Sequence, residues 1–252
     1  MENRFSGKVA VVTGSSHGIG LAAVEIFASQ GAKVYLVDID RNKGGEAALK
    51  LREQGLNVKF IECDVASPQS VQNMVASIEE NNVDILCNNA GVELTAGIDE
   101  TSVEEWDRLS SINLRGPFLV TKALLPLLEV KGAAVVNTSS ISGLLGWPLS
   151  TAYCATKGGV IQLTKQLACD LGAKNIRVNC VCPGTTKTPM LSRLLSDDEE
   201  GRQAAKEIAA RHLLKRFAEP REIAEAIVFL ASDAASFVTG AVLPVDGGYT
   251  AK

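Results

Sequence analysis

Histidine is nearly absent from this chain of 252 residues, which holds only His17 and His212. Ser-His-Asp sites, Cys-His sites and most zinc centres need a histidine within a cluster of partner residues. The shortage excludes most schemes of those kinds, and His17 is expected only to fill loop space or touch a phosphate. Acid–base chemistry near neutral pH is therefore expected to use tyrosine, lysine or a carboxylate with a shifted pKa.

Long hydrophobic runs and a strong net charge are also lacking. No apolar stretch approaches the ~20 residues that a transmembrane helix needs, and the segment from Met1 to Phe5 lacks the apolar core of a secretory signal. The formal net charge of −4 gives no basic patch typical of proteins that bind nucleic acids or membrane surfaces. We expect a cytoplasmic protein without a nucleic-acid or membrane partner.

The six cysteines are scattered along the chain, mostly among apolar residues. This is typical of reduced thiols that pack as small hydrophobic side chains. Cys180 and Cys182 alternate along a predicted strand and should face the same side of it. Because no second Cys or His pair accompanies them, we predict neither a disulfide framework nor a bound metal.

Short β-branched apolar segments alternate with longer helical segments along nearly the whole chain. Continuous apolar character is typical of strands buried on both faces, as in a parallel sheet. The alternation predicts one α/β domain over residues 1–252, a doubly wound Rossmann-type fold of about seven parallel strands with helices on both faces. The strands are expected at Val9–Thr13, Lys33–Val37, Val58–Glu62, Ile85–Asn88, Ala133–Thr138, Arg177–Val181 and Val242–Val245. The main helices are expected at Ile19–Gln30, Ala47–Gln54, Ser70–Glu80, Val103–Leu128 with a bend at Gly116-Pro117, Thr156–Leu171 and Pro220–Ala231.

The segment Thr188–Leu214 interrupts this compact pattern. It follows a Pro-Gly pair, begins with polar residues and carries the acidic run Asp197–Glu200. It would add about two helices and is predicted to be a lid or substrate flap. A plain pair of surface helices fits the composition equally well.

A glycine-rich turn joins the first predicted strand to the first predicted helix, in the order Thr13-Gly14-Ser15-Ser16-His17-Gly18-Ile19-Gly20. Glycines let the backbone turn sharply and approach a ligand closely. The start of the following helix offers free N–H groups and a positive dipole end to a diphosphate. The Gly-x-x-x-Gly-x-Gly spacing differs from the commonest dinucleotide fingerprint, and a plain tight turn is the alternative, but the strand–turn–helix context favours a dinucleotide site.

Polar residues at the ends of the next three strands predict further cofactor contacts. Asp38, 18 residues beyond Gly20, can bind both ribose hydroxyls of NAD and repel a 2′-phosphate, although Arg41 leaves NADP as a less favoured alternative. A simple helix-capping role for Asp38 is the other interpretation. Asp64 can meet the adenine amino group, and the small residues of Asn88–Gly91 leave room for the adenine ribose. Open α/β sheets bind ligands at these carboxyl ends of strands, so NAD is the predicted cofactor.

Tyr153 and Lys157 stand four residues apart, which places both on one face of a helix. A nearby cation favours phenolate, and lowering a tyrosine pKa from about 10 to roughly 7–8 needs on the order of 3–4 kcal/mol. The pair makes Tyr153 a candidate general acid and base. A packed ring beside a solvated lysine is the ordinary alternative.

These motifs resemble those of the short-chain dehydrogenase/reductase family over nearly the whole chain. In addition to the residues above, the resemblance rests on Asn113, Ser139-Ser140, Pro183-Gly184, Thr188 and the ending Val245-Asp246-Gly247-Gly248. It implies a catalytic tetrad of Asn113, Ser140, Tyr153 and Lys157.

The resemblance gives each member of the tetrad a role. Tyr153 would exchange a proton with the substrate oxygen, and Ser140 would hydrogen-bond that oxygen. Lys157 would bind the nicotinamide ribose and lower the Tyr153 pKa, and Asn113 would hold a water that links Lys157 to solvent. Ser140 is preferred to Ser139 because it stands thirteen residues before Tyr153, the spacing that the family uses.

The family pattern also implies the residues that contact NAD. Thr186 departs from it, because family members often have an aliphatic residue there, and Lys187 is unusual in charge. The implied contacts are Gly14, Ser16, His17, Gly18, Ile19, Gly20, Asp38, Asp64, Val65, Asn89, Ala90, Gly91, Tyr153, Lys157, Pro183, Gly184, Thr186 and Thr188.

Substrate contacts are expected from loops at the strand ends, namely from Glu93, Ser140, Trp147, Tyr153 and Met190. Trp147 would stack on a ring or sugar, or would only anchor its loop. Glu93 would meet a polyol hydroxyl or a cation, or would point to water. These cues do not select one small-molecule alcohol or ketone.

The resemblance implies an NAD-dependent oxidoreductase that interconverts a secondary alcohol and a ketone by hydride transfer, with Tyr153 as general acid and base. It also implies a homotetramer built on the segments Val103–Leu128 and Thr156–Leu171. An epimerase or an enoyl-type reductase on the same fold is an alternative, although enoyl reductases of the family generally space the tyrosine and lysine further apart. A catalytically inactive NAD-sensing protein is a further alternative, but such proteins usually lack a tetrad residue.

Overall fold

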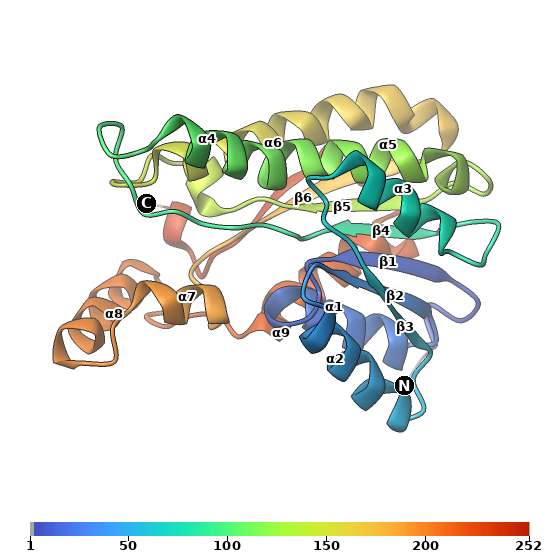
Figure 1. Ribbon diagram of the computed structural model, residues 1–252, viewed down its shortest axis with the longest axis horizontal. Coiled ribbons are helices and arrows are strands. Elements are labelled where there is room, and N and C mark those ends of the chain that lie inside the picture. The colour runs from blue at the N-terminus through green and yellow to red at the C-terminus, as the bar shows by residue number, and fades with distance from the viewer. Residues whose placement is uncertain (1–2, 252) are drawn as a thin grey trace.

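The computed structural model describes residues 3–251, and within them one parallel sheet of seven strands carries helices on both faces (Figure 1). The strand order is β3-β2-β1-β4-β5-β6-β7, so the order reverses between β1 and β4. The predicted fold class is confirmed, and each strand lies within two residues of its predicted bounds. The strands are β1 (Val9–Thr13), β2 (Lys33–Asp38), β3 (Val58–Glu62), β4 (Ile85–Asn88), β5 (Ala134–Thr138), β6 (Arg177–Pro183) and β7 (Val242–Val245).

The helices follow the predicted order with shifted ends. Helix α2 begins six residues before the predicted Ala47, because the Asp40 carboxylate caps it by accepting from the Lys43 N–H, at 3.0 Å. Helix α6 begins five residues before the predicted Thr156, and α3 ends at Ala76. The helices are α1 (Gly18–Ser29), α2 (Arg41–Glu53), α3 (Pro68–Ala76), α4 (Val103–Ser110), α5 (Gly116–Leu128), α6 (Thr151–Leu171), α7 (Pro189–Leu194), α8 (Glu199–Arg211) and α9 (Pro220–Ala231).

The predicted long helix Val103–Leu128 is interrupted, and at a different place from the expected one. A π-helical turn, Ser111–Arg115, separates α4 from α5, whereas Pro117 lies in the first turn of α5. Proline is tolerated in a first turn because its missing N–H would have no partner there. The helix is therefore interrupted a few residues before the predicted place, Gly116-Pro117, in the turn that contains Asn113.

Two apolar layers enclose the sheet. Figure 1 shows α1, α2 and α9 on one face and α3, α4, α5 and α6 on the other. All five residues of β1 are buried, and they alternate between the two layers, with Ala10 facing the first and Val11 the second. Burial on both faces explains the continuous apolar character of the strands.

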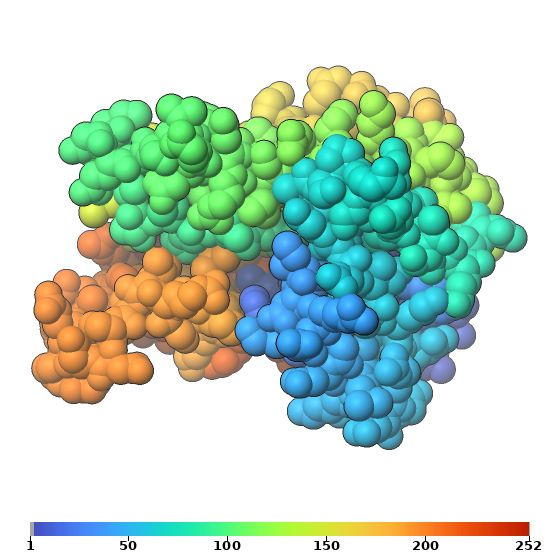
Figure 2. All heavy atoms as spheres, in the orientation of Figure 1, coloured from blue at the N-terminus to red at the C-terminus, as the bar shows by residue number. Residues whose placement is uncertain are grey.

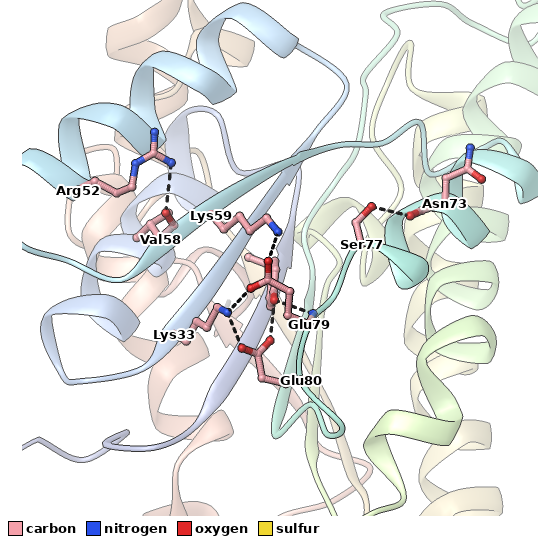
Figure 3. A network of polar contacts seen from close by, with 9 residues as sticks. Lys33, Arg52, Val58, Lys59, Asn73, Ser77, Glu79 and Glu80 are labelled. Carbon is pink, nitrogen blue, oxygen red and sulfur yellow. Dashed lines mark hydrogen bonds and ion pairs between the residues drawn. The ribbon is translucent and has the colours of Figure 1, made fainter.

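A cluster of charged residues joins β2 and β3 to the chain after α3, outside the helical layers. Lys33 ion-pairs with Glu79 and Glu80, and Lys59 pairs with Glu79 at 2.7 Å (Figure 3). The Tyr35 hydroxyl donates to Glu80 at 2.5 Å. None of these residues reaches the cavity described below, so the cluster supports the edge of the sheet only.

Helices α7 and α8 occupy the segment predicted as a flap and lie beyond the sheet on one side of the molecule (Figure 1). The segment is tied to the domain by a parallel bridge between Thr186 and Ala218 at its base. In the space-filling view a hollow separates it from the N-terminal half (Figure 2).

Candidate active site

A cavity of about 640 Å³ lies at the carboxyl ends of the strands, between the glycine turn and α7. Most of the predicted site residues line it: Gly14, His17, Gly18, Ile19, Asp38, Asp64, Val65, Asn89, Ala90, Gly91, Glu93, Ser140, Trp147, Tyr153, Lys157, Pro183, Gly184, Thr186, Thr188 and Met190. Ser16, Gly20 and Asn113 lie behind its wall instead. The fold thus brings residues from six strand ends and the flap into one cavity.

The glycine turn is held against the end of β4. Gly14 adopts φ +62°, and a Cβ there would lie 2.5 Å from the Ala90 Cα. The Asn89 side-chain amide donates to the carbonyl oxygens of Thr13 and Gly14 at 3.2 and 2.8 Å. A Cβ on Gly20 would overlap the Gly14 carbonyl, so Gly20 permits this close packing rather than facing the cavity.

Helix α1 begins at this turn, and no side chain caps its first backbone N–H groups. His17 occupies the capping position and makes no side-chain cap hydrogen bond. Uncapped N–H groups and the positive end of the helix dipole suit an anion such as a diphosphate.

Asp38 ends β2 at the cavity wall and is buried. One carboxylate oxygen accepts from the Ser16 N–H at 2.9 Å and the other from the Asp40 N–H at 3.0 Å, which explains the place of Ser16 behind the wall. Arg41 is outside the cavity and pairs with Glu62 at 3.9 Å. The basic side chain at this end of the cavity is Lys43, whose ammonium lies 3.2 Å from the Asp40 carboxylate. Its position follows from the early start of α2, which the sequence did not reveal.

Tyr153 and Lys157 lie in the first two turns of α6, and both are buried. The Lys157 Nζ stands 5.7 Å from the centre of the Tyr153 ring and donates to the Thr138 carbonyl at 2.9 Å. The ordinary alternative of a solvated lysine is therefore wrong.

The expected lowering of the Tyr153 pKa is not what this site shows. Burial raises the pKa of Tyr153, the Glu93 carboxylate raises it further, and a hydrogen bond with Ser140 opposes them. Burial also lowers the pKa of Lys157 to about 8. The loss of water around the Tyr153 phenolate raises its pKa more than the Lys157 ammonium lowers it. The ammonium faces the ring and the Thr138 carbonyl.

The two candidate serines occupy different environments. Ser139 donates its hydroxyl to the Lys157 carbonyl at 2.7 Å and so holds α6 against β5. The Ser140 Oγ accepts from the Ser142 N–H at 3.1 Å and faces the cavity beside Tyr153. Of the two, only Ser140 is placed to meet a ligand oxygen near the phenol.

Asn113 lies in the π-helical turn, where its side chain is fully used by the protein. Its Oδ1 accepts from the Val92 N–H at 2.8 Å, and its Nδ2 donates to the Val92 carbonyl at 2.8 Å and to the Thr156 hydroxyl at 3.2 Å. A Cβ placed on Gly91 would lie 3.3 Å from both the Asn113 Oδ1 and the Lys157 Nζ. Asn113 therefore fixes the loop after β4 beside Lys157, and π-helical turns often mark such functional places.

The substrate end of the cavity contains an aromatic cluster, of which the sequence predicted only Trp147 as a site residue. Trp147 lines the cavity and also packs, with its ring 5.7 Å from Tyr249 and 5.4 Å from the Arg211 guanidinium. The Tyr249 ring in turn lies 5.1 Å from His212. Both interpretations of Trp147 are thus compatible with its place, as cavity wall and as loop anchor.

His212 is a positioning residue that was missed. Its buried ring accepts from the Thr185 N–H at 3.2 Å through Nε2, and its Nδ1 donates to the Ile208 carbonyl at 3.1 Å. It therefore connects the end of α8 to the loop after β6, which includes Gly184 and Thr186. The one sequence feature that could have drawn attention to His212 is that the chain has only two histidines.

Within residues 3–251, no group of three or more His, Cys, Asp or Glu side chains is arranged to hold a metal ion. None of the helices in this part of the chain is long and apolar enough to cross a membrane. All six cysteines are free thiols, with Cys180 and Cys182 packed in one apolar cluster as predicted.

The sheet order, the glycine turn and the buried Tyr–Lys pair define a doubly wound α/β protein with a cavity at the carboxyl ends of its strands. A family model described as enoyl-(acyl carrier protein) reductase matches residues 14–250. A cyclopentanol dehydrogenase from a Comamonas species is 42% identical over 252 residues, covering 99% of both chains. The 2-(S)-hydroxypropyl-CoM dehydrogenase 3 of Xanthobacter autotrophicus is 39% identical over 255 residues, covering 100% of both. The crystal structure of gox2181 superimposes with a TM-score of 0.93 at 35% identity, covering 99% of this chain and 98% of that one.

The chain belongs to the short-chain dehydrogenase/reductase family, as its motifs predicted. These two relatives are named dehydrogenases, and the chain matches them over nearly their whole length. The chain is therefore an oxidoreductase of that family.

Proposed function

We propose that the protein is an NAD-dependent dehydrogenase that interconverts a secondary alcohol and a ketone. One observation carries the proposal: a buried phenol, an ammonium and a serine hydroxyl share one cavity with a glycine turn and the buried carboxylate of Asp38. The relatives named for cyclopentanol and hydroxypropyl-CoM support an alcohol as substrate.

The residues present fit a dinucleotide. The N–H groups at the start of α1 would hold the diphosphate, Asp38 the adenosine ribose, and Asp64 with Val65 the adenine. Thr186 and Thr188 line the cavity beside the loop held by His212 and would meet the carboxamide. When bound, the nicotinamide supplies the hydride acceptor or donor.

NAD fits this cleft better than NADP. The Asp38 carboxylate is buried at the wall and would repel a 2′-phosphate, while Arg41 is turned to Glu62. Among residues 3–251, Lys43 is the cation that lines this end of the cavity, and the Asp40 carboxylate already pairs with it.

The chain's own residues move the proton. In the direction of reduction Tyr153 donates its proton to the carbonyl oxygen, and its raised pKa keeps it protonated for that task. In the direction of oxidation the Tyr153 phenolate accepts the proton of the alcohol, and the Lys157 ammonium at the ring face favours that phenolate before the transfer. Ser140 donates a hydrogen bond to the same oxygen and orients it. Asn113 holds the loop beside Lys157, where a water relay to solvent would start.

An enoyl-type reductase is the second candidate, because it is the printed description of the matching family model. The four-residue step from Tyr153 to Lys157 and the serine beside the phenol both favour a carbonyl or carbinol substrate instead. A sensor that binds NAD without turnover, or an epimerase, is less well supported, because all four residues of the tetrad stand at the cleft or directly behind it.

A homotetramer in the cytoplasm remains part of the proposal. Helices α4 and α5 leave Val103 and Phe118 exposed, which suits a contact between copies. Light scattering after size-exclusion chromatography measures the mass directly.

The decisive experiment is a panel of secondary alcohols, ketones and an enoyl thioester, run with NAD(H) and with NADP(H) and followed by nicotinamide absorbance. Tyr153→Phe should lower turnover by on the order of 10²–10⁴-fold, because it deletes the acid–base group and little volume. Its binding of NADH should be unchanged. Tyr35→Phe removes a hydroxyl from the remote charged cluster and serves as the matched control, with turnover retained.

Retained turnover in Tyr153→Phe would defeat the assigned role. Turnover of the enoyl thioester alone would favour the second candidate, and NADH binding without turnover of any compound would favour a sensor.

A further inference from the structure

Glu93 stands out among the residues of the cavity because its carboxylate accepts no hydrogen bond from the described part of the chain. It lies in the loop after β4, next to Val92 in the sequence. Its side chain lines the cavity and is half-buried. Among residues 3–251 no group donates a hydrogen bond to its carboxylate, and no lysine or arginine forms an ion pair with it. The mechanism above does not use it.

The carboxylate lies within electrostatic reach of the reacting groups. Burial raises the pKa of Glu93, and the charges of Lys157 and then Arg193 oppose that rise. Glu93 in turn raises the pKa of both Tyr153 and Lys157. Glu93 lines the same cavity as the reacting phenol of Tyr153 and as Arg193 of the flap helix α7, so it borders the space that a substrate would occupy.

The other walls of this end are mainly apolar. Val92, Ile141, Leu191 and Leu194 line the cavity together with Trp147. A carboxylate that loses water in such surroundings is costly unless a partner donates hydrogen bonds to it. The protein supplies no such donor, so a ligand that does would gain a charge-assisted hydrogen bond.

The charge balance selects a neutral donor. Lys157 and Arg193 already offset the negative charge of Glu93, so an additional ammonium on the ligand would meet two cations. A hydroxyl satisfies the carboxylate without adding charge.

Given the proposed function, we propose that Glu93 recognises a second hydroxyl on the substrate, one or two carbons from the carbinol that reacts at Tyr153. The substrate class is then a small diol or polyol, with the corresponding hydroxyketone as product. The apolar walls contact its carbon skeleton, and Ser140 and Tyr153 hold the reacting oxygen.

Matched substrates test this inference. The kcat/KM values for cyclopentanol and 1,2-cyclopentanediol are compared in the wild type, Glu93→Gln and Glu93→Leu, with NAD saturating. The wild type should prefer the diol by about tenfold or more, and Glu93→Leu should abolish that preference, since a hydrogen bond to a charged group is worth roughly 10–100-fold. Glu93→Gln keeps an acceptor oxygen and should retain part of the preference. Glu53→Gln, at an exposed position late in α2, is the control and should behave as the wild type.

Three results would overturn the inference. Equal losses for both alcohols in Glu93→Leu would mean that Glu93 acts only through the pKa of Tyr153 or Lys157. If Arg193→Leu lost the diol preference as completely as Glu93→Leu, the flap arginine would be the residue that recognises the second hydroxyl. A stronger preference for 2-aminocyclopentanol than for the diol would make the subsite one for a cation.

A binding measurement separates this inference from the proposed function. In the Tyr153→Phe protein loaded with NADH, calorimetric titration with the diol should show binding that Glu93→Leu weakens at least tenfold. Glu93-dependent binding in a wild type that turns over no alcohol would defeat the proposed function and leave the Glu93 contact standing. Alcohol turnover without Glu93-dependent diol binding would defeat this inference alone.

Discussion

The two sides of the cleft are built in different ways. On the cofactor side, backbone groups and short side chains hold the wall, as in the contacts of Asn89 with the glycine turn and of Asp38 with Ser16. On the substrate side, α7 and α8 lie beyond the sheet (Figure 1), and large side chains such as Trp147 and His212 connect them to the rest.

The difference teaches where the protein tolerates change. At Gly14 and Gly20 on the cofactor side, close backbone packing leaves no space, so an added Cβ there must displace main chain. Side chains that pack across a partly open cleft can be exchanged at a smaller cost, and the substrate preference can change with them.

The largest effect is expected at Gly14. Gly14→Ala places a methyl 2.5 Å from the Ala90 Cα at a positive φ of +62°, so the turn must open. NADH binding, measured by fluorescence titration, should weaken by about 100-fold or more, since overpacking costs roughly 1–3 kcal/mol and the backbone strain adds to it. Affinity within threefold of the wild type would contradict the close-packed description of this side.

The second effect is a pH dependence at Lys157, where the two sides meet. Its pKa is about 8 when folded, against 10.5 as the ordinary value, so between these values the unfolded chain holds a proton that the folded chain has released. Stability should therefore rise with pH in this window by up to about 1.4 kcal/mol per pH unit. The raised pKa of Tyr153 acts in the opposite sense only above about pH 10.

Urea unfolding of the cofactor-free protein between about pH 8 and pH 10 measures this rise. Lys157→Met removes the titrating group, so the wild type should gain roughly 2–3 kcal/mol relative to the variant across the window. A difference between the two proteins that stays constant with pH would show that burial does not lower the pKa of Lys157 in the folded protein.

A smaller effect is expected on the substrate side, at Trp147. Trp147→Ala removes the ring that packs between Tyr249 and Arg211 and should lower kcat/KM by about tenfold, since one packing contact is worth about 1–2 kcal/mol. The affinity for NADH should be unchanged, and Trp147→Phe should restore most of the loss. Equal losses in NADH affinity and kcat/KM would erase the distinction between the two sides.

The cofactor side was also the part that sequence alone predicted best. The strands are continuous apolar runs, and the glycine spacing and Asp38 fall at strand ends, so local pattern carries their positions. The start of α2, the π-helical turn at Asn113 and the contact of His212 with Thr185 depend on side chains from distant segments, which no local pattern encodes. The direction of the Tyr153 pKa was missed for the same reason, because burial in the folded protein outweighs the neighbouring cation.

The smallest effect is expected at Gly45, which stands next to Gly44 in α2 at the cofactor end of the molecule. A Cβ on Gly45 meets no atom within 4 Å, whereas one on Gly44 would overlap the Phe60 ring. Gly45→Ala should raise the free energy of unfolding by about 0.5–1 kcal/mol, because alanine favours a helix interior over glycine, and leave kcat/KM unchanged. Gly44→Ala should instead lower stability by roughly 1–3 kcal/mol through overpacking. Chemical denaturation of the two variants measures this difference. A rise in the free energy of unfolding of both variants would mean that the Phe60 ring can move aside and that the packing on this side is looser than the contacts imply.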